Sequence, residues 1–292
     1  MSKNKLNTGI FAENECLFRC PLCYGQMKLI NLKSLICTNQ HCFDISKQGY
    51  INMLSRATQT KYNSQMFESR RTICRTDFFL PMIKKISRII MSNSECQNKQ
   101  IKILDVGCGE GSNLSMIQAI VSQNIEKDLL GVGLDISKEG ICIASKEYPN
   151  TIWCVGDLAK APLADNQFNF ILNILTPANY AEFKRMISPG GMVIKVIPES
   201  GYLQEIRDVF YEHTDKKIYT NDKTIELFRN KFNLVEIDRL RYIVNLDHTR
   251  IESLIQMTPL SWGATKERFQ KALEMTLSEV TVDLTILVGK IA

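Results

Sequence analysis

The chain has 292 residues and a formal net charge of +5, from 36 Lys and Arg against 31 Asp and Glu. With 45% hydrophobic and 23% charged residues it has enough apolar side chains for a packed core, which excludes wholesale disorder. No stretch approaches the roughly 20 apolar residues of a transmembrane helix, and the N-terminus lacks the apolar run of a signal peptide. We therefore expect a cytoplasmic protein with one large domain and a smaller module.

Cysteines crowd near the N-terminus, and five of the ten lie within the first 42 residues. Cys20 and Cys23 form the C-x-x-C knuckle of structural zinc sites, and Cys37 and His41 complete a four-ligand shell. Cys42 competes with His41 for the fourth place, because its spacing from Cys37 is also reasonable. Thiolates and imidazole suit Zn²⁺ better than hard cations do. The spacing predicts a zinc-binding module at residues 16–54.

Residues 55–99 are predicted to be a linker and a helical segment. Apolar positions recur at helical spacing in two segments between Gln65 and Met91, with Pro81 near the start of the second. The region from 47 to 88 contains two acids, Glu68 and Asp77, and nine basic residues: Lys47, Arg56, Lys61, Arg70, Arg71, Arg75, Lys84, Lys85 and Arg88. Such a bias indicates either a phosphate-binding surface or solvated helix faces.

Between residues 43 and 62, three aromatic residues alternate with basic residues. Phe43, Tyr50 and Tyr62 are able to stack on unpaired nucleobases, although core packing is the alternative for Phe43 and Tyr50.

Residues 100–292 alternate between strand and helix patterns. Five apolar strands are expected at 101–106, 129–135, 151–157, 168–175 and 191–198, and two more at 239–247 and 280–292. Helices are expected near 112–122, 137–147, 178–187, 200–213, 249–257 and 264–277. Continuous apolar strands indicate burial on both faces, as in a parallel sheet covered by helices. The sequence therefore predicts an α/β, Rossmann-like domain with a seven-stranded sheet.

A glycine loop with the pattern D-x-G-x-G-x-G follows the first of these strands. It comprises Asp105, Gly107, Gly109, Glu110 and Gly111 and leads directly into a helix. Glycines permit a tight turn and the close approach of a ligand to the main chain. A dinucleotide fold uses similar spacing, but the pattern differs from G-x-G-x-x-G, and the leading acid suits an amine better than a pyrophosphate.

Acids also end the next two strands. Asp135, followed by Ile136, is placed to accept the ribose hydroxyls of a nucleoside. Asp157 is placed to accept an adenine amino group, and Leu158 to donate its backbone N–H to the ring. Because the carboxyl ends of parallel strands share one edge, these residues predict one ligand crevice.

The glycine loop and its acids resemble those of class I S-adenosylmethionine-dependent methyltransferases. FRCPLC, CTNQHCFDISKQGYINML, QMFESRR, LDVGCGEG and LIQMTPLSW, in this order, resemble the large-subunit (23S) ribosomal RNA guanine-N1 methyltransferases. The resemblance implies methyl transfer to a hairpin guanine, a zinc site at Cys20, Cys23, Cys37 and His41, and a homodimer. It also implies cofactor contacts at Asn113, Leu114, Phe79 and Tyr202; at the last two, some relatives carry tyrosine and histidine.

The loop after the fourth strand is the place where relatives in the wider class put groups that contact the target. Asn173, Asn179 and Tyr180 are therefore candidate catalytic residues, and Asn173 is also a candidate cofactor contact. A proline turn with a structural tyrosine is the alternative. No general base for guanine N1 is identified.

Two other functions fit parts of the pattern: a small-molecule or protein methyltransferase with a structural zinc module, and a non-catalytic RNA-binding factor. The intact glycine loop argues against the second. The sequence leaves open which guanine is methylated, on which any effect on macrolides depends, and whether free RNA or an assembled subunit is bound.

Overall fold

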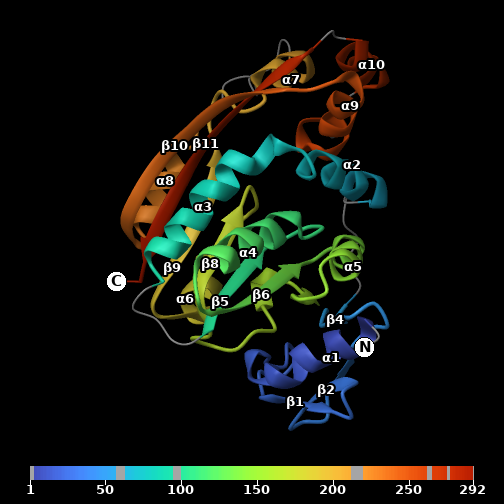
Figure 1. The fold of residues 1–292 in the computed structure, drawn as a ribbon, viewed down its shortest axis with the longest axis vertical. Helices are drawn as coiled ribbons and strands as arrows, with labels where there is room; N and C mark the ends of the chain where they lie inside the picture. Colours follow the sequence, from blue (N-terminus) through green and yellow to red (C-terminus); the bar gives the residue numbers. More distant parts are fainter. Residues whose placement is uncertain are drawn as a thin grey trace.

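The computed structural model describes residues 3–56, 63–94, 100–211, 220–261, 265–274 and 277–291. Lys61 and Tyr62 lie outside the described residues. So do residues 212 and 213 of the expected helix 200–213, residues 264, 275 and 276 of the expected helix 264–277, and residue 292 of the last expected strand. The described chain forms one large sheet with helices on both faces and a small N-terminal sheet at one end (Figure 1).

The large sheet has the strand order β10-β11-β9-β8-β5-β6-β7-β4. Neighbours from β4 to β9 are parallel, and β11 is antiparallel to both β9 and β10. All seven residues of β8 are buried, because helices cover both faces of the sheet. This is the predicted class I methyltransferase fold. The strands are β4 (Tyr50–Asn52), β5 (Gln100–Val106), β6 (Asp128–Asp135), β7 (Ile152–Val155), β8 (Phe168–Ile174), β9 (Ile187–Pro198), β10 (Asn233–Asn245) and β11 (Glu279–Lys290).

The prediction of seven strands is wrong, because β4 adds an eighth. This strand ends the segment predicted as the zinc-binding module, yet it pairs in parallel with β7, Tyr50 opposite Trp153. Tyr50 is 5% exposed and lies in the core, which is the alternative considered for it. A strand of three residues is too short to show a periodic pattern, and only its tertiary partner defines it.

Two elements near the C-terminus also differ from the prediction. Strand β10 begins at Asn233, six residues before the predicted start, and helix α8 (Asp222–Arg229) was not expected. Helix α8 is mostly polar, because Phe228 is its one fully buried residue, and a polar segment gives little indication of a helix. Alternation of exposed and half-buried residues in β10 reflects an edge strand with one covered face.

The two faces of the sheet carry separate apolar clusters. On one face pack α3 (Leu80–Ser92), α4 (Ser112–Asn124) and α5 (Lys138–Glu147), and Figure 1 shows α3 and α4 in front of the sheet. On the other face pack α1 (Lys3–Glu13), α6 (Tyr180–Met186) and α8.

Four further helices lie beyond the carboxyl ends of the strands (Figure 1). They are α2 (Ser64–Cys74), α7 (Gln204–Phe210), α9 (His248–Met257) and α10 (Lys266–Glu274). Helices α2 and α9 are joined by a hydrogen bond of 2.8 Å from Ser69 Oγ to Gln256 Oε1. The expected pair of helices between Gln65 and Met91 is confirmed as α2 and α3, with Pro81 in the first turn of α3.

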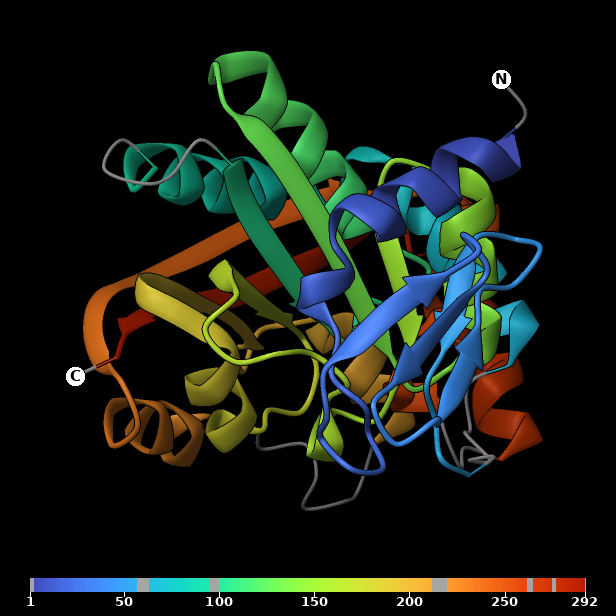
Figure 2. The same ribbon diagram turned by 90° about the horizontal axis from the view of Figure 1, so that it is seen from below.

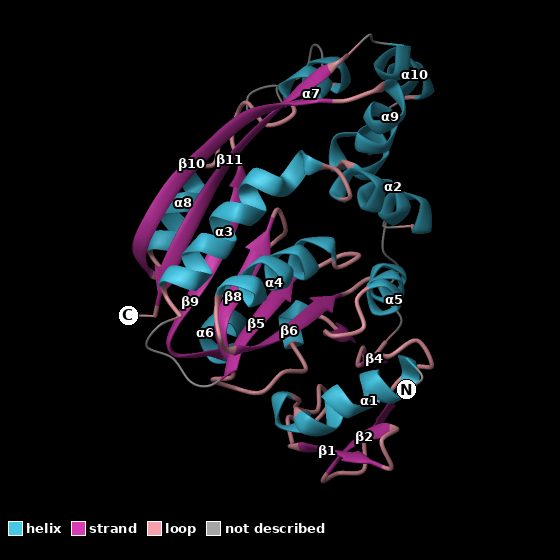
Figure 3. Cartoon of the chain, in the orientation of Figure 1, coloured by secondary structure: helices cyan, strands magenta, loops and turns pink. Residues whose placement is uncertain are grey.

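The N-terminal module contains β1 (Met27–Ile30), β2 (Ser34–Cys37) and β3 (Cys42–Asp44) in one antiparallel sheet. Figure 2 shows it beside the edge of the large sheet, next to α1, and Figure 3 shows β1 and β2 apart from the strands of the large sheet. Phe18 and Phe11 stack with ring centroids 5.7 Å apart and belong to the same apolar cluster as Leu130, Val132 and Leu134 of β6. The module is therefore packed against the large domain through a continuous core.

The packing of β6 against Trp153 gives a test of this core. A Cβ at Gly133 would lie 2.2 Å from the fully buried Trp153 ring, whereas a Cβ at Gly9 in α1 would meet nothing within 4 Å. We expect Gly133→Ala to lower the unfolding free energy by roughly 1–3 kcal/mol or more, the usual cost of overpacking. Gly9→Ala, as the matched control, is expected to leave the thermal midpoint unchanged or slightly raised. Equal midpoints for the two variants would contradict the packing described.

Candidate cofactor pocket and metal centre

The glycine loop after β5 adopts a backbone that favours glycine. Gly107, Gly109 and Gly111 have φ of 73°, 60° and 86°, in the left-handed region. A Cβ at Gly107 would lie 2.4 Å from Thr176 Oγ1, and one at Gly111 would lie 2.5 Å from the Trp153 ring. The loop is thus wedged between the segment after β8 and the core below, and the main chain of Gly109 faces the cavity described next.

Asp135, the last residue of β6, holds this loop in place. Its Oδ2 accepts a hydrogen bond of 2.8 Å from the backbone N–H of Gly109, and its Oδ1 accepts one of 2.8 Å from Ser137. Ser137 in turn caps helix α5. Each carboxylate oxygen has two acceptor positions, so both oxygens retain capacity for a ligand hydroxyl. Burial raises the pKa of Asp135.

Three buried acceptors at the loop have no hydrogen-bond partner, and one of them, Glu110 Oε1, faces Arg70. Asp105 is 2% exposed and its Oδ1 accepts nothing, and Oδ1 of Asn113, which is 4% exposed, is also unpaired. Burial raises the pKa of Asp105 to about 7, with nearby Asp135 and Glu110 adding to the effect and Arg70 opposing it. Unsatisfied buried acceptors are costly, so this corner is shaped for a donor, and a cationic amine fits it best.

A cavity of about 560 Å³ opens at the carboxyl ends of β5, β6 and β8. Five residues predicted for the cofactor site line it: Gly107, Gly109, Asp135, Phe79 and Tyr202. Its remaining lining comes from α2, the end of β8 and the segment after it, the end of β9, α7 with the residue after it, and the end of α9 with the segment after it: Met66, Phe67, Arg70, Ile174, Leu175, Thr176, Pro198, Arg207, Tyr211, Met257, Thr258, Pro259 and Leu260.

Arg70 connects α2 to the acids of the glycine loop. Its Nε lies 3.4 Å from Glu110 Oε1, and its guanidinium lies over the Phe79 ring, 5.9 Å from the centroid. Glu110 is 1% exposed and also accepts hydrogen bonds from the backbone and hydroxyl of Ser112. Arg70 therefore compensates part of the negative charge buried in this corner.

The metal centre is formed by Cys20, Cys23, Cys37 and His41, whose ligand atoms all lie within 4.8 Å of one another. His41 Nδ1 lies 3.4 Å from the sulfurs of both Cys20 and Cys37, and the sulfurs of Cys23 and Cys37 are 3.6 Å apart. Tetrahedral zinc with Zn–S of about 2.3 Å separates its ligands by ~3.7 Å, so this set fits zinc.

The backbone around the ligands favours metal binding. A hydrogen bond from the backbone of Gly25 lowers the pKa of Cys23 to about 6, which favours the thiolate that binds zinc. Burial raises the pKa of Cys20 to about 11, and a bound cation would reverse that shift. Cys42 is exposed on β3, and its thiol donates to Asp44 Oδ1 at 3.9 Å. The structure thus brings His41 into the cluster and leaves Cys42 outside.

Residues 18–61 match the family model described as RlmA, N-terminal, a zinc ribbon, and residues 103–191 match a methyltransferase domain. A Bacillus subtilis (strain 168) protein, YxjB, whose name describes it as a 23S rRNA (guanine-N1)-methyltransferase, is 41% identical over 275 residues, covering 94% of this chain and 96% of the relative. The chain belongs to the 23S rRNA guanine-N1 methyltransferase family. A Streptomyces fradiae relative, named 23S rRNA (guanine(748)-N(1))-methyltransferase, is 26% identical, with 92% and 95% of the two chains covered.

Several residues predicted for the site of this family member lie away from the cavity. Tyr180 is 9% exposed, and its ring meets Phe183, Phe228 and Phe232 edge-on. Asn179 caps α6 by accepting from the backbone of Glu182. Neither side chain lines the cavity, and both have the local contacts expected of the alternative, a proline turn with a structural tyrosine.

Other predicted residues have mainly local partners. Asn173 is fully buried, donates to the Pro177 carbonyl at 3.1 Å and accepts from Lys195. Asp157 accepts from the backbone of Ala159 and caps the short helix η3 (Leu158–Lys160). Leu114 is fully buried in α4, and Ile136 is half-buried beside Asp135.

The basic region between 47 and 88 is not one cationic face. Arg70 lines the cavity, Arg71 and Arg75 pair with Glu147, and Lys85 pairs with Glu236 and Asp238. Lys47, Arg56, Lys84 and Arg88 are exposed. About half of the predicted phosphate-binding charge is therefore used within the protein.

Sequence reasoning missed the role of α2 and of the C-terminal segment in the cavity. Met66, Phe67 and Arg70 lie within the QMFESRR motif, and Met257 to Leu260 lie within LIQMTPLSW. Both motifs contribute to the family resemblance, but the sequence does not indicate that they lie near the glycine loop. Only the fold shows that they line the same cavity. Among the described residues, no helix combines the length and apolar character needed to cross a bilayer.

Zinc analysis of variants tests the metal centre. We expect about one zinc ion per chain in the wild type, and less than a tenth of that in Cys23→Ser and His41→Ala, because three ligands hold zinc much more weakly than four. Cys42→Ser is the matched control and should retain full zinc, measured by atomic emission after dialysis. Loss of zinc in Cys42→Ser with retention in His41→Ala would show that the fourth ligand is assigned wrongly.

Proposed function

We propose that the chain transfers the methyl group of S-adenosylmethionine to N1 of a guanine in a 23S rRNA hairpin loop. The observation that carries the proposal is the cavity at the carboxyl ends of β5 and β6, lined by Gly107, Gly109 and Asp135, together with the unpartnered buried acceptors of Asp105 and Asn113 at the glycine loop. Its support from relatives is the 41% identity across almost the whole length of a protein named for this reaction.

The residues around the glycine loop fit the cofactor. Asp105 and Asn113 would receive the amino group of its methionine part, Asp135 the ribose hydroxyls, and Asp157 with Leu158 the adenine. The glycine loop, with Glu110, Leu114 and Ile136 around it, would shape the main chain against the ligand, and Phe79 and Tyr202 would pack on it. When bound, the cofactor supplies a methyl group activated on a sulfonium.

The outer part of the cavity fits a flat, uncharged base. Ile174, Leu175 and Thr176 line one part of the cavity, and Met257 to Leu260 line another. These walls would hold the base edge-on to the sulfonium and exclude water, which lowers the barrier by positioning. Asn173 supports this role through Pro177 and Lys195 behind the wall.

The target must be unpaired to enter this cavity, because N1 of a paired guanine is engaged in the duplex. Arg207 lines the cavity, donates to the carbonyls of Ser200 and Tyr202, and is 7% exposed. A cation at this wall would stabilise negative charge on O6 as the N1 proton passes to solvent.

We divide the chain into a zinc-binding module at residues 16–54, a linker and helical segment at 55–99, and a methyltransferase domain at 100–292. The zinc-binding module would hold the RNA outside the cavity. Leu22, Tyr24, Ile30 and Leu32 of the module are large exposed apolar side chains, and Lys28 and Lys33 beside them are exposed bases. An aromatic ring that can stack on a nucleobase, next to basic side chains that can contact phosphates, suits the binding of single-stranded RNA.

We further propose a homodimer in the cytoplasm. Val235, Ile237 and Ile243 are exposed on β10, which within the described chain pairs only with β11. Exposed apolar side chains on an edge strand favour an interface. Light scattering of the purified protein tests this, since a mass of 33.4 kDa would indicate a monomer.

The pKa of Asp105 predicts a pH dependence for cofactor binding. The carboxyl is mostly protonated at pH 6 and mostly ionised at pH 8, because its pKa is raised to about 7. A cationic amine binds the ionised form, so calorimetry should show affinity rising roughly tenfold between these pH values. Asp105→Asn should bind more weakly and show a flat profile. A flat profile in the wild type would contradict the role of Asp105.

Methyl transfer tests the function directly. The protein is incubated with S-adenosylmethionine and 23S rRNA from a strain that lacks the modification, and the digested RNA is analysed by mass spectrometry. We expect about one N1-methylguanosine per 23S rRNA and none from free guanosine, because the module must hold the RNA around the loop. Methylation of small molecules or proteins alone would overturn the proposal and favour the alternative methyltransferase reading.

A further inference from the structure

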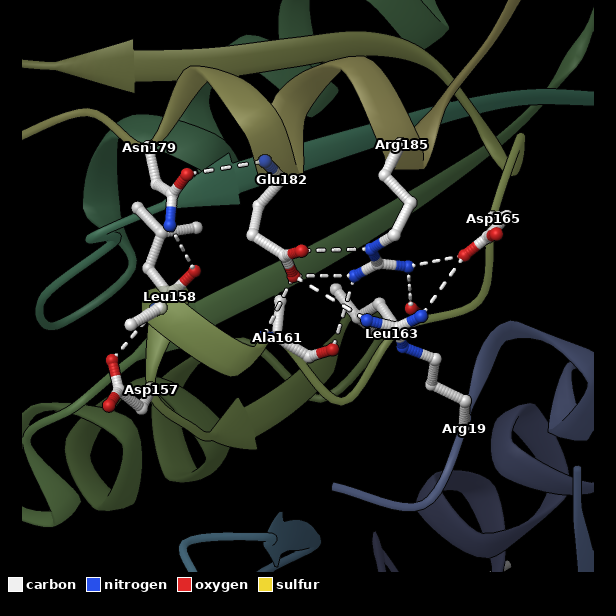
Figure 4. A network of polar contacts seen from close by, with 10 residues as sticks. Arg19, Asp157, Leu158, Ala161, Leu163, Asp165, Asn179, Glu182 and Arg185 are labelled. Atoms are coloured by element: carbon white, nitrogen blue, oxygen red, sulfur yellow. Dashed lines mark hydrogen bonds and ion pairs between the residues drawn. The ribbon is translucent and has the colours of Figure 1, made fainter. Parts of the chain in front are cut away.

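The zinc-binding module is joined to the large domain by a network of charged residues. The main chain of residues 17–19 pairs with residues 162–164: Arg19 N–H donates to Pro162 at 3.2 Å, and Ala164 N–H donates to Leu17 at 2.8 Å. From this ribbon the Arg19 side chain reaches Asp165 Oδ1 at 3.3 Å and Glu182 Oε2 at 3.8 Å (Figure 4). Arg19 directly precedes the metal ligand Cys20.

Glu182 on α6 is the centre of this network. Its carboxylate accepts from Arg185 Nε at 3.0 Å and Nη2 at 2.6 Å, and from the backbone N–H of Ala161 at 3.0 Å. Arg185 also donates to the carbonyls of Leu163 and Ala161 and to Asp165. The side chains of Arg19, Glu182 and Arg185 are only 17%, 14% and 16% exposed, so solvent screens these contacts weakly.

The same helix reaches the segment 174–176, which lines the cavity, and the turn that follows β7. Helix α6 follows the wall formed by Ile174, Leu175 and Thr176, and its cap, Asn179, donates to the Leu158 carbonyl at 3.4 Å. Leu158 begins η3, the turn capped by Asp157 at the end of β7. Figure 4 shows Asn179, Glu182 and Arg185 spaced along α6 and facing η3, the segment 161–165 and Arg19.

We infer that Glu182, together with Arg19 and Arg185, is a positioning network that fixes the zinc-binding module relative to helix α6, which follows the cavity wall 174–176 and contacts η3. Arg19 precedes Cys20 of the metal centre, so its contact with Glu182 fixes the position of the module on helix α6. The same helix follows the cavity wall 174–176. RNA held by the module thus meets the cavity at a fixed distance and orientation. This last step rests on the proposed RNA substrate; the docking itself does not.

Two variants, one on each side of the contact, test the inference. Glu182→Gln keeps the shape but removes the charge shared by two arginines, and Arg19→Ala removes the link from the module. Arg19→Lys retains the charge. Glu236→Gln, in the ion pair with Lys85 on the far edge strand, is the matched control for losing a carboxylate from an ion pair.

Zinc content and S-adenosylmethionine affinity are expected to stay within twofold of wild type in all four variants. Glu182→Gln and Arg19→Ala should both raise KM for rRNA at least tenfold with a smaller change in kcat, while Arg19→Lys and Glu236→Gln stay within threefold. Hydrogen exchange at the amides of Ala161 and Ala164 should be at least tenfold faster in the first two variants only.

Three results would overturn the inference: unchanged KM for rRNA in both variants, a parallel loss of cofactor affinity, or a defect in Glu182→Gln with none in Arg19→Ala. If the wild type does not methylate rRNA, the proposed function fails, yet hydrogen exchange still decides the docking. Unchanged exchange at Ala161 and Ala164 in both variants would refute it independently.

Discussion

The carboxylate of Asp135 accepts hydrogen bonds of 2.8 Å from the backbone N–H groups of Gly109 and Ser137, and thereby joins the turns that follow β5 and β6. Parallel strands end at one edge of a sheet, and the turns beyond them would diverge without such a link. This link holds the glycine loop open toward the cavity and starts helix α5 through Ser137. Cofactor contacts, the wall after β8 and the position of α2 all depend on where this loop lies.

Buried negative charge connects the stability of this region with its function. Asp105, Glu110 and Asp135 lie close together, and Arg70 is the cation that faces them. The raised pKa of Asp105 means that the ligand-free protein loses stability as pH rises from the ordinary value of 3.8 through about 7, since the folded state disfavours the ionised form. A cationic ligand removes this cost. Cofactor binding is thus favoured by the same burial that destabilises the empty pocket.

The sequence predicted the features that depend on neighbours in the chain. Gly107 and Gly109 are recognisable because the turn needs left-handed backbone, and Cys20 and Cys23 because a knuckle places two ligands on one ion. Asp135 was identified because a polar residue ended an apolar strand. In contrast, Phe79 and Tyr202 were found only through family resemblance, because no local pattern marks a residue that reaches a distant pocket.

Features that depend on tertiary contacts were missed or misplaced. Arg70 looked like one of nine phosphate-binding bases, but folding of α2 over the glycine loop places it against Glu110. Tyr180 was a candidate catalytic residue in the loop after the fourth strand, but Phe228 and Phe232, some fifty residues later, contact its ring. Strand β4 is defined only by its pairing with β7. In each case the deciding partner lies far away in the sequence.

Calorimetric titration of Asp135→Ala with S-adenosylmethionine tests most directly whether this carboxylate holds the site. The loss of two charge-assisted hydrogen bonds, at ~1.5–3 kcal/mol each, should weaken binding by about a hundredfold or more. Asp128→Ala, an exposed acid at the other end of the same strand, serves as the control and should bind like the wild type. Equal affinity in the two variants, with both folded, would contradict the account.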